Sequence, residues 1–238
     1  EKVTIKSLLS LFSRLFELSN YLQLLDEVNK LDPLTGYYNP IGINNYVYKL
    51  NNEKRLDKFN TLYVNIKNCK LINRICGGIQ NGDILIRQFA DIIYDSLEED
   101  EIMGRYGEDN FAILVKKENT KKILELLKSI PVSANINGGI ISINIEAVVG
   151  YYENNLNDSF YTIIDSSSTA MNIAKSLNNI NVVKFDSELK EKIELSRLIQ
   201  KNFFLDLNDE KIVPYYQPKV DINNNTICSS EALSRWFN

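Results

Sequence analysis

Residues 101–116 read EIMGRYGEDNFAILVK, and this stretch decides the fold. Two runs near 101–106 and 111–116 flank the polar turn Gly107-Glu108-Asp109-Asn110, which predicts a β-hairpin. Further strands are expected at Thr61–Ile66, between 132 and 152, and at 180–186. Helical patterns alternate with these strands at 40–53, 69–76, 83–98, 118–129 and 159–177. The mixture indicates an α+β sheet with helices on both faces.

The composition is that of a soluble globular protein. The chain has 238 residues, of which 44% are hydrophobic and 24% charged, enough for a sizeable core. A net charge of -4 offers no broad basic field to nucleic acid, and no apolar run is long enough to span a membrane. Three cysteines without metal or disulfide spacing, and no signal-peptide pattern, favour the cytoplasm. Histidine is absent, which excludes His-based triads and zinc sites in this chain.

Residues 1–31 are predicted to form one long signalling helix that ends at Asp32-Pro33, because proline disfavours a helical predecessor. Leucines recur three and four residues apart, as in the seam of a coiled coil. The seam residues are Leu8, Leu11, Leu15, Leu18, Leu22 and Leu25. This pattern favours a parallel homodimer. The neighbouring Leu9, Phe12 and Phe16 leave open an amphipathic helix that lies on its own domain.

Two domains are expected after this helix, at 32–186 and 187–238. A helix at 187–205 leads to a second β region with short strands and an Asn223-Asn224-Asn225 turn. The expected strands are Ile212–Tyr216, Lys219–Ile222 and Thr226–Glu231. Since the chain stops at Asn238 directly after an apolar run, we expect a fragment cut inside its second domain.

Three motifs resemble those of GGDEF domains, the diguanylate cyclase family. DPLTGYYN at 32–39 is similar to the family's opening DxLTGLxN, RYGEDNF at 105–111 to its RxGGDEF hairpin, and AK at 174–175 with 178–181 to its terminal AKxxGRN segment. They occur in the family's order and at its spacing. The resemblance implies a nucleotide-cyclase palm-like fold in which two facing domains join two GTP molecules into cyclic di-GMP.

The resemblance also implies a Mg²⁺ site, held by a carboxylate at the end of the first strand and by others in the hairpin. Asn65 and Asn110 stand at two of these positions, and neutral amides do not offset a metal's charge. Asp109 is the only acid left at the matched positions. Glu108 replaces a glycine, so we expect it to repel a triphosphate, or else to point into solvent as an ordinary hairpin residue.

Possible nucleotide-binding residues survive by the same resemblance. Asn73 matches a guanine-binding amide, with a turn residue as the alternative. Asp83 matches a guanine-contacting acid one residue out of register, with the N-cap of the next helix as the alternative. Lys175 matches a phosphate-facing lysine, with an exposed surface lysine as the alternative, and Asn179 replaces an expected arginine. The four acids at 98–101, where the family carries a product-binding RxxD, suggest a solvated helix end.

The last residues resemble the start of an EAL domain, a family of metal-dependent cyclic di-GMP phosphodiesterases. The motifs that show this resemblance are YQPKV at 216–220 and EALSRW at 231–236. By resemblance, Glu231 would be a Mg²⁺ or Mn²⁺ ligand, and the ligand contacts would be Gln217, Leu233 and Arg235. The family's other metal acids are absent here, so this fragment is not expected to hydrolyse cyclic di-GMP.

The leading hypothesis is a cyclic di-GMP signalling protein in which a degenerate GGDEF domain binds GTP and regulates a downstream EAL phosphodiesterase. A second hypothesis is a weakly active diguanylate cyclase that relies on Asp109. A third is a dimerising scaffold without a ligand.

Overall fold

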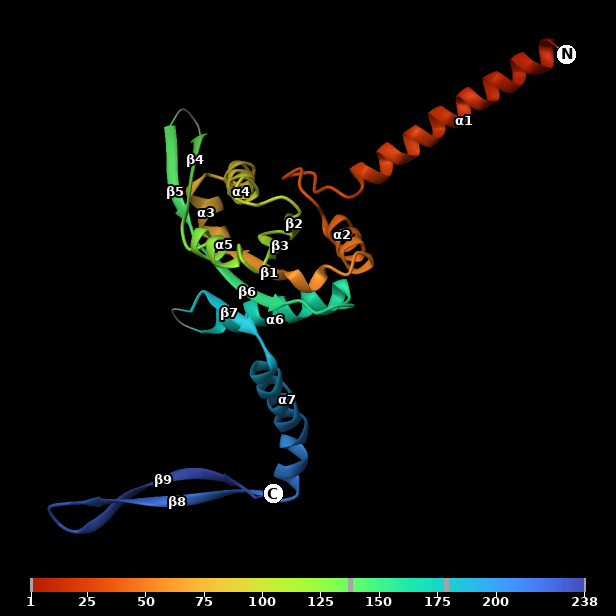
Figure 1. Ribbon diagram of the computed structural model, residues 1–238. Helices are drawn as coiled ribbons and strands as arrows, with labels where there is room; N and C mark the ends of the chain where they lie inside the picture. The colour runs from red at the N-terminus through yellow and green to blue at the C-terminus, as the bar shows by residue number, and fades with distance from the viewer. Residues whose placement is uncertain (1, 137–138, 178–179, 238) are drawn as a thin grey trace. The chain divides into compact units, whose positions relative to one another are not determined.

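The computed structural model describes residues 2–136, 139–177 and 180–237 and divides into two compact units, residues 1–185 and 186–238 (Figure 1). In the first unit a central sheet has the strand order β2-β3-β1-β6-β7. Its strands are β1 (Phe59–Ile66), β2 (Ile102–Gly107), β3 (Asn110–Lys116), β6 (Ala147–Glu153) and β7 (Val182–Phe185). The pair β6–β7 is parallel and the neighbouring pairs are antiparallel.

Helices cover both faces of this sheet, which confirms the predicted α+β palm-like fold (Figure 1). The apolar layer on one face includes residues of α2 and α6, and the layer on the other includes residues of α3, α4 and α5. These helices are α2 (Pro40–Asn52), α3 (Cys69–Ile75), α4 (Ile79–Tyr94), α5 (Thr120–Leu126) and α6 (Phe160–Ser176).

Strand β1 runs through the middle of the core, and all its residues are buried. Leu62 and Val64 belong to the layer of α3, α4 and α5, whereas Phe59 and Tyr63 belong to the layer of α2 and α6. Side chains alternate between the two faces of a strand. A strand covered by helices on both faces therefore needs apolar residues at odd and at even positions. Three buried polar residues depart from that requirement: Asn60 and Thr61 near the start of the strand and Asn65 near its end.

The segment expected as β structure between 132 and 152 forms three strands. Two of them, β4 (Ile130–Ile136) and β5 (Gly139–Ile145), pair with each other outside the central sheet, and the third is β6. The helix expected at 83–98 instead begins at Ile79 and ends at Tyr94. Its start follows Gly78, which has a φ of +144°, a conformation that suits glycine alone. This residue separates α3 from α4.

The acidic stretch at 98–101 was expected to be a solvated helix end, but α4 ends at Tyr94, and only Glu98 and Glu99 of the stretch are exposed. Glu101 is 6% exposed. Its carboxylate accepts hydrogen bonds from the backbone N–H of Lys116 at 2.8 Å and from Asn119 Nδ2 at 2.6 Å. Glu101 thus links the start of β2 to the end of β3, because a buried carboxylate needs such partners.

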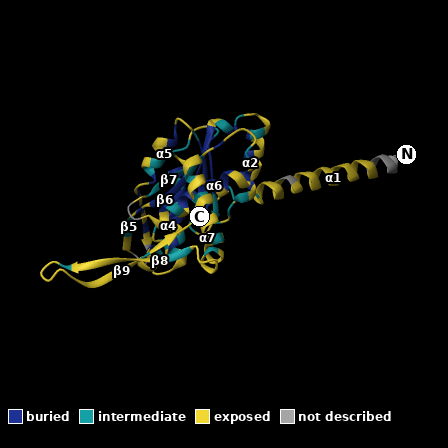
Figure 2. Ribbon diagram, turned by 90° about the horizontal axis from the view of Figure 1, so that it is seen from below, coloured by how far each residue is buried: buried dark blue, intermediate teal, exposed yellow. Residues whose placement is uncertain are grey.

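Helix α1 (Lys2–Val28) ends before the predicted stop at Asp32-Pro33. Its leucine seam is open to solvent, from Leu8 at 49% exposed to Leu25 at 40%. The neighbouring Phe12 and Phe16 are each 68% exposed, and the described residues of α1 are exposed along the helix (Figure 2). Across the described ranges, no helix combines the length and the apolar character that crossing a membrane requires.

The second unit consists of α7 (Ser187–Asn208) and an antiparallel hairpin of β8 (Ile212–Asp221) and β9 (Thr226–Trp236). Two long strands therefore replace the three short ones that we predicted. The expected break falls at Pro218, yet β8 continues through it with Pro218 opposite Ser230. A two-stranded sheet has a free edge on each strand, and proline is tolerated there because no donor is needed on that side.

Candidate functional site

The candidate site lies where the ends of β1 and of the β2–β3 hairpin meet. Asn65 and Asn110 are direct partners in the β1–β3 register. Asn65 Nδ2 donates a hydrogen bond to Asn110 Oδ1 at 2.9 Å, and Asn65 is 4% exposed. Asn110 Nδ2 also reaches the carbonyl of Gly107 at 3.4 Å. The two amides at the matched metal positions therefore have partners within the protein.

The hairpin turn is fixed by backbone conformation and by Arg105. Gly107 has a φ of +136° and Glu108 a φ of +45°. Arg105 Nε and Nη2 donate to the carbonyl of Glu108 at 3.0 and 2.5 Å. The Glu108 side chain is exposed and is not among the residues that line the pocket described below, a position that favours the solvent alternative for it.

The opening motif at 32–39 contacts this hairpin and helps to hold Arg105 in place. Asp32 Oδ1 accepts hydrogen bonds from the N–H and hydroxyl of Thr35, each at 2.9 Å, and lies 3.6 Å from Arg105 Nη1. The backbone N–H of Arg105 donates to the carbonyl of Tyr38 at 2.8 Å. The motif thus orders its own turn and positions the arginine that holds the β2–β3 turn.

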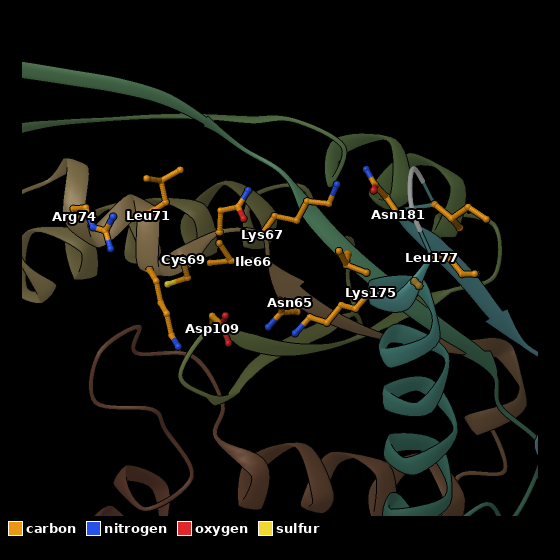
Figure 3. Close-up of a pocket in the computed structure, with 15 residues that line it drawn as sticks. Asn65, Ile66, Lys67, Cys69, Leu71, Arg74, Asp109, Lys175, Leu177 and Asn181 are labelled. Atoms are coloured by element: carbon orange, nitrogen blue, oxygen red, sulfur yellow. The ribbon is translucent and has the colours of Figure 1, made fainter. Parts of the chain in front are cut away.

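A pocket of about 730 Å³ opens beside the amide pair (Figure 3). Asn65 and Asp109 lie at its centre, Cys69 and Arg74 border it from α3, and Lys175 extends toward the strand ends from α6 (Figure 3). The pocket therefore joins the hairpin, the end of β1 and two helices that come from opposite faces of the sheet.

The lining of the pocket is strongly cationic. It contains Lys67, Lys70, Arg74 and Lys175 but a single carboxylate, that of Asp109. Lys67 Nζ is paired with Glu146 at 3.2 Å. Within the described part of the chain, the side chains of the other three cations have no ion-pair or hydrogen-bond partner. The pocket thus carries an excess of unbalanced positive charge.

Cys69 is not an activated thiol. Burial raises the pKa of the Cys69 thiol, and the nearby Asp109 carboxylate raises it further. The thiolate is the nucleophilic form, so a raised pKa keeps Cys69 protonated and unreactive near neutral pH.

The donor set does not fit the divalent cation that the family motif implies. Mg²⁺ prefers anionic oxygen ligands, and here two of the three matched positions carry amides that are bonded to each other. Among the described residues, no group of three or more Cys, Asp or Glu side chains has the geometry to hold a metal ion.

Asn73 and Asp83 lie near the pocket but do not line it. Asn73 is within α3, and Asp83 is inside α4, whose N-cap is Gly78. Both structural alternatives, a turn residue and a helix N-cap, are therefore wrong. Asn73 Oδ1 is buried without a hydrogen-bond partner and lies so close to Gly82 that any larger residue there would collide with it.

Lys175 does line the pocket, from the last turn of α6, where its side chain is exposed. Asn179, which stands where the family has arginine, lies outside the described residues, as does Asn178. Asn181, at the end of the same motif, borders the pocket.

In the second unit, the four residues with predicted EAL roles share one face of the β8–β9 hairpin. Gln217 is directly opposite Glu231, and Leu233 and Arg235 follow at alternate positions of β9. Glu231 Oε2 lies 3.4 Å from Lys219 Nζ at the exposed surface. The hairpin therefore brings these residues together.

Sequence reasoning missed the cationic set on α3. Lys70 and Arg74 are four residues apart, so they lie on one face of the helix. The sequence motifs assigned a role to neither Lys70 nor Arg74. Their shared spacing is the signal that would have found them.

Comparison with known proteins agrees with this fold. Residues 29–179, more than half of the chain, match the family "Diguanylate cyclase, GGDEF domain". The chain belongs to the GGDEF family. It is 26% identical over 208 residues to cyclic di-GMP phosphodiesterase PdeR of Escherichia coli (strain K12), covering 86% of this chain and 31% of that protein. The chain thus spans less than a third of that relative's length.

Two solved structures share the fold at low identity. One is the coiled coil and GGDEF domain of DgcB from Caulobacter crescentus in complex with c-di-GMP, with 19% identity, a TM-score of 0.57, and 74% of this chain and 96% of that chain covered. The other is the S helix-GGDEF-EAL part of Vibrio cholerae LapD bound to c-di-GMP, with 16% identity and a TM-score of 0.58. That match covers 93% of this chain and 52% of the LapD chain.

Proposed function

We propose that this chain belongs to a cyclic di-GMP signalling protein in which the GGDEF domain is not a cyclase but a GTP-sensing regulator of a downstream EAL phosphodiesterase. The observation that carries the proposal is the Asn65–Asn110 hydrogen bond at the matched metal positions. Two carboxylates facing each other there would need a cation between them. Two neutral amides can instead form a hydrogen bond with each other and need no cation between them.

The direct test is diguanylate cyclase activity. Purified protein incubated with GTP and Mg²⁺ or Mn²⁺ is expected to form no cyclic di-GMP above a buffer blank, measured by chromatography. Clear formation of cyclic di-GMP would contradict the proposal and favour the weakly active cyclase. In that event an Asp109→Asn variant would show whether the remaining acid supports the turnover.

Sensing is tested by calorimetric titration of GTP in the presence of Mg²⁺, where micromolar affinity is expected. The ligand-free scaffold is the second candidate, favoured by the exposed Leu8–Leu25 seam, which suits a coiled-coil homodimer. Light scattering of the chain with and without residues 1–30 tests the dimer. A dimer that persists without the helix would show that another surface holds it.

The second unit supports the EAL part of the proposal. In the full-length protein, Glu231 would hold Mg²⁺ or Mn²⁺, while Gln217, Leu233 and Arg235 would contact cyclic di-GMP. Their common face on the hairpin is the supporting observation. A Glu231→Gln variant of the full-length protein is expected to lose phosphodiesterase activity, whereas Glu194→Gln, an exposed change on α7, is expected to keep it.

A further inference from the structure

We propose that the pocket binds a nucleoside triphosphate without a divalent cation, its phosphate charge being balanced by Lys70, Arg74 and Lys175. The inference rests on the proposed GTP-sensing function and specifies how the ligand is held. Nucleotide binding at this site would then be independent of metal ions.

The first argument is the unbalanced charge on the lining of the pocket. Lys70 and Arg74 share a face of α3, and like charges at this spacing repel each other. Lys175 adds a third unpartnered cation from α6 (Figure 3). A polyanion between the two helices would relieve this repulsion, and its oxygens would accept charge-assisted hydrogen bonds.

The second argument is the poor fit of a dication. Apart from Lys67, which is paired with Glu146, three cations and one carboxylate line the pocket, so Mg²⁺ would be repelled more than it is attracted. The oxygen atoms that Mg²⁺ would otherwise use on Asn65 and Asn110 are neutral, and that of Asn110 already accepts the Asn65 amide. In this pocket, therefore, the side chains themselves supply the positive charge that a triphosphate requires.

The third argument is the size and donor chemistry of the pocket. A volume of about 730 Å³ is within the range of small-molecule sites. Arg74 presents a planar fork that can hold two phosphate oxygens, whereas Lys70 and Lys175 act as point charges. This set favours phosphate groups over a neutral ligand.

The experiment is calorimetric titration of the 238-residue chain with GTP, once in Mg²⁺ and once in EDTA. The two affinities are expected to agree within about twofold, and inorganic triphosphate is expected to compete with GTP. In EDTA, Arg74→Ala should weaken GTP binding about tenfold, the size of one charge-assisted hydrogen bond. Arg197→Ala, an exposed change on α7, should leave it unchanged.

Each other outcome has a definite meaning. Binding that requires Mg²⁺ overturns this inference and leaves the GTP-sensing proposal intact. Binding in EDTA that is unaffected by Arg74→Ala or by inorganic triphosphate also overturns it. The absence of GTP binding in both buffers overturns this inference and the sensing role, while the cyclase assay remains a separate test of lost synthesis.

Discussion

On the strand side of the pocket, Asn65 is buried and donates a hydrogen bond to the half-buried Asn110. On the helix side, Lys70, Arg74 and Lys175 are exposed and, among the described residues, have no partner. Both sides stand where the family motifs place nucleotide chemistry. The two sides differ in whether their polar side chains have hydrogen-bond or ion-pair partners within the protein.

This difference separates structural from ligand-facing residues. A buried amide that already has its partner contributes to the fold and gains little from a ligand. An unpaired cation at a pocket gains most when an anion arrives. Under the proposed function, the strand side contributes to the fold and the helix side would contact the ligand.

The sharpest way to break this comparison is to return charge to the strand side. The double variant Asn65→Asp/Asn110→Asp would place two carboxylates opposite each other, one at the buried position 65 and one at the half-buried position 110. Without divalent cations we expect the free energy of unfolding to fall by about 3 kcal/mol, the scale for an uncompensated buried charge. Urea denaturation measures this loss, and added Mg²⁺ should restore part of it.

The matched control is Asn44→Asp/Asn45→Asp, two exposed positions on α2. It should change the free energy of unfolding by less than about 0.5 kcal/mol and should not respond to Mg²⁺. Equal losses in both double variants would show that the strand side is not a special environment for charge.

A smaller effect is expected when one amide is removed. Asn65→Ala leaves Asn110 Oδ1 without its donor, while Asn110 Nδ2 keeps only its long contact to the Gly107 carbonyl. The expected loss is about 1–2 kcal/mol, the cost of an unsatisfied buried polar group. Thermal denaturation measures it, with the exposed Asn45→Ala as control. A loss no larger than that of the control would mean that the amide pair does not stabilise the fold.

The meeting of Asn65 and Asn110 could be predicted from the sequence. Both residues belong to motifs with fixed positions on a strand and a hairpin, and strand register then brings them together. The same holds for the hairpin at 101–116 and for the covered sheet, because alternation and turn residues are local signals.

The placement of Asp83 and Glu101 could not be predicted in this way. The start of α4 depends on Gly77 and Gly78, whose φ values of +77° and +144° accommodate the extra residue before Asp83. Glu101 is buried because donors from Lys116 and Asn119, distant in sequence, reach its carboxylate. Spacing and charge runs carry no information about such contacts.

The smallest change in the free energy of unfolding is expected for a substitution on the helix side. The informative result is whether that free energy rises or falls. Lys70→Glu removes the repulsion with Arg74, creates an i,i+4 ion pair and places an acid in the first turn of α3. The free energy of unfolding should rise by about 0.2–0.5 kcal/mol at low ionic strength and the gain should vanish at high ionic strength.

Lys70→Gln, which removes the repulsion without adding the ion pair, should give a smaller gain in chemical denaturation. GTP affinity should fall in both variants, so stability and binding should change in opposite directions. Such opposition is expected where a charge is kept for a ligand at the expense of the free protein. If both variants were less stable than the parent, Lys70 would be a structural residue and the two sides of the pocket would not differ as argued.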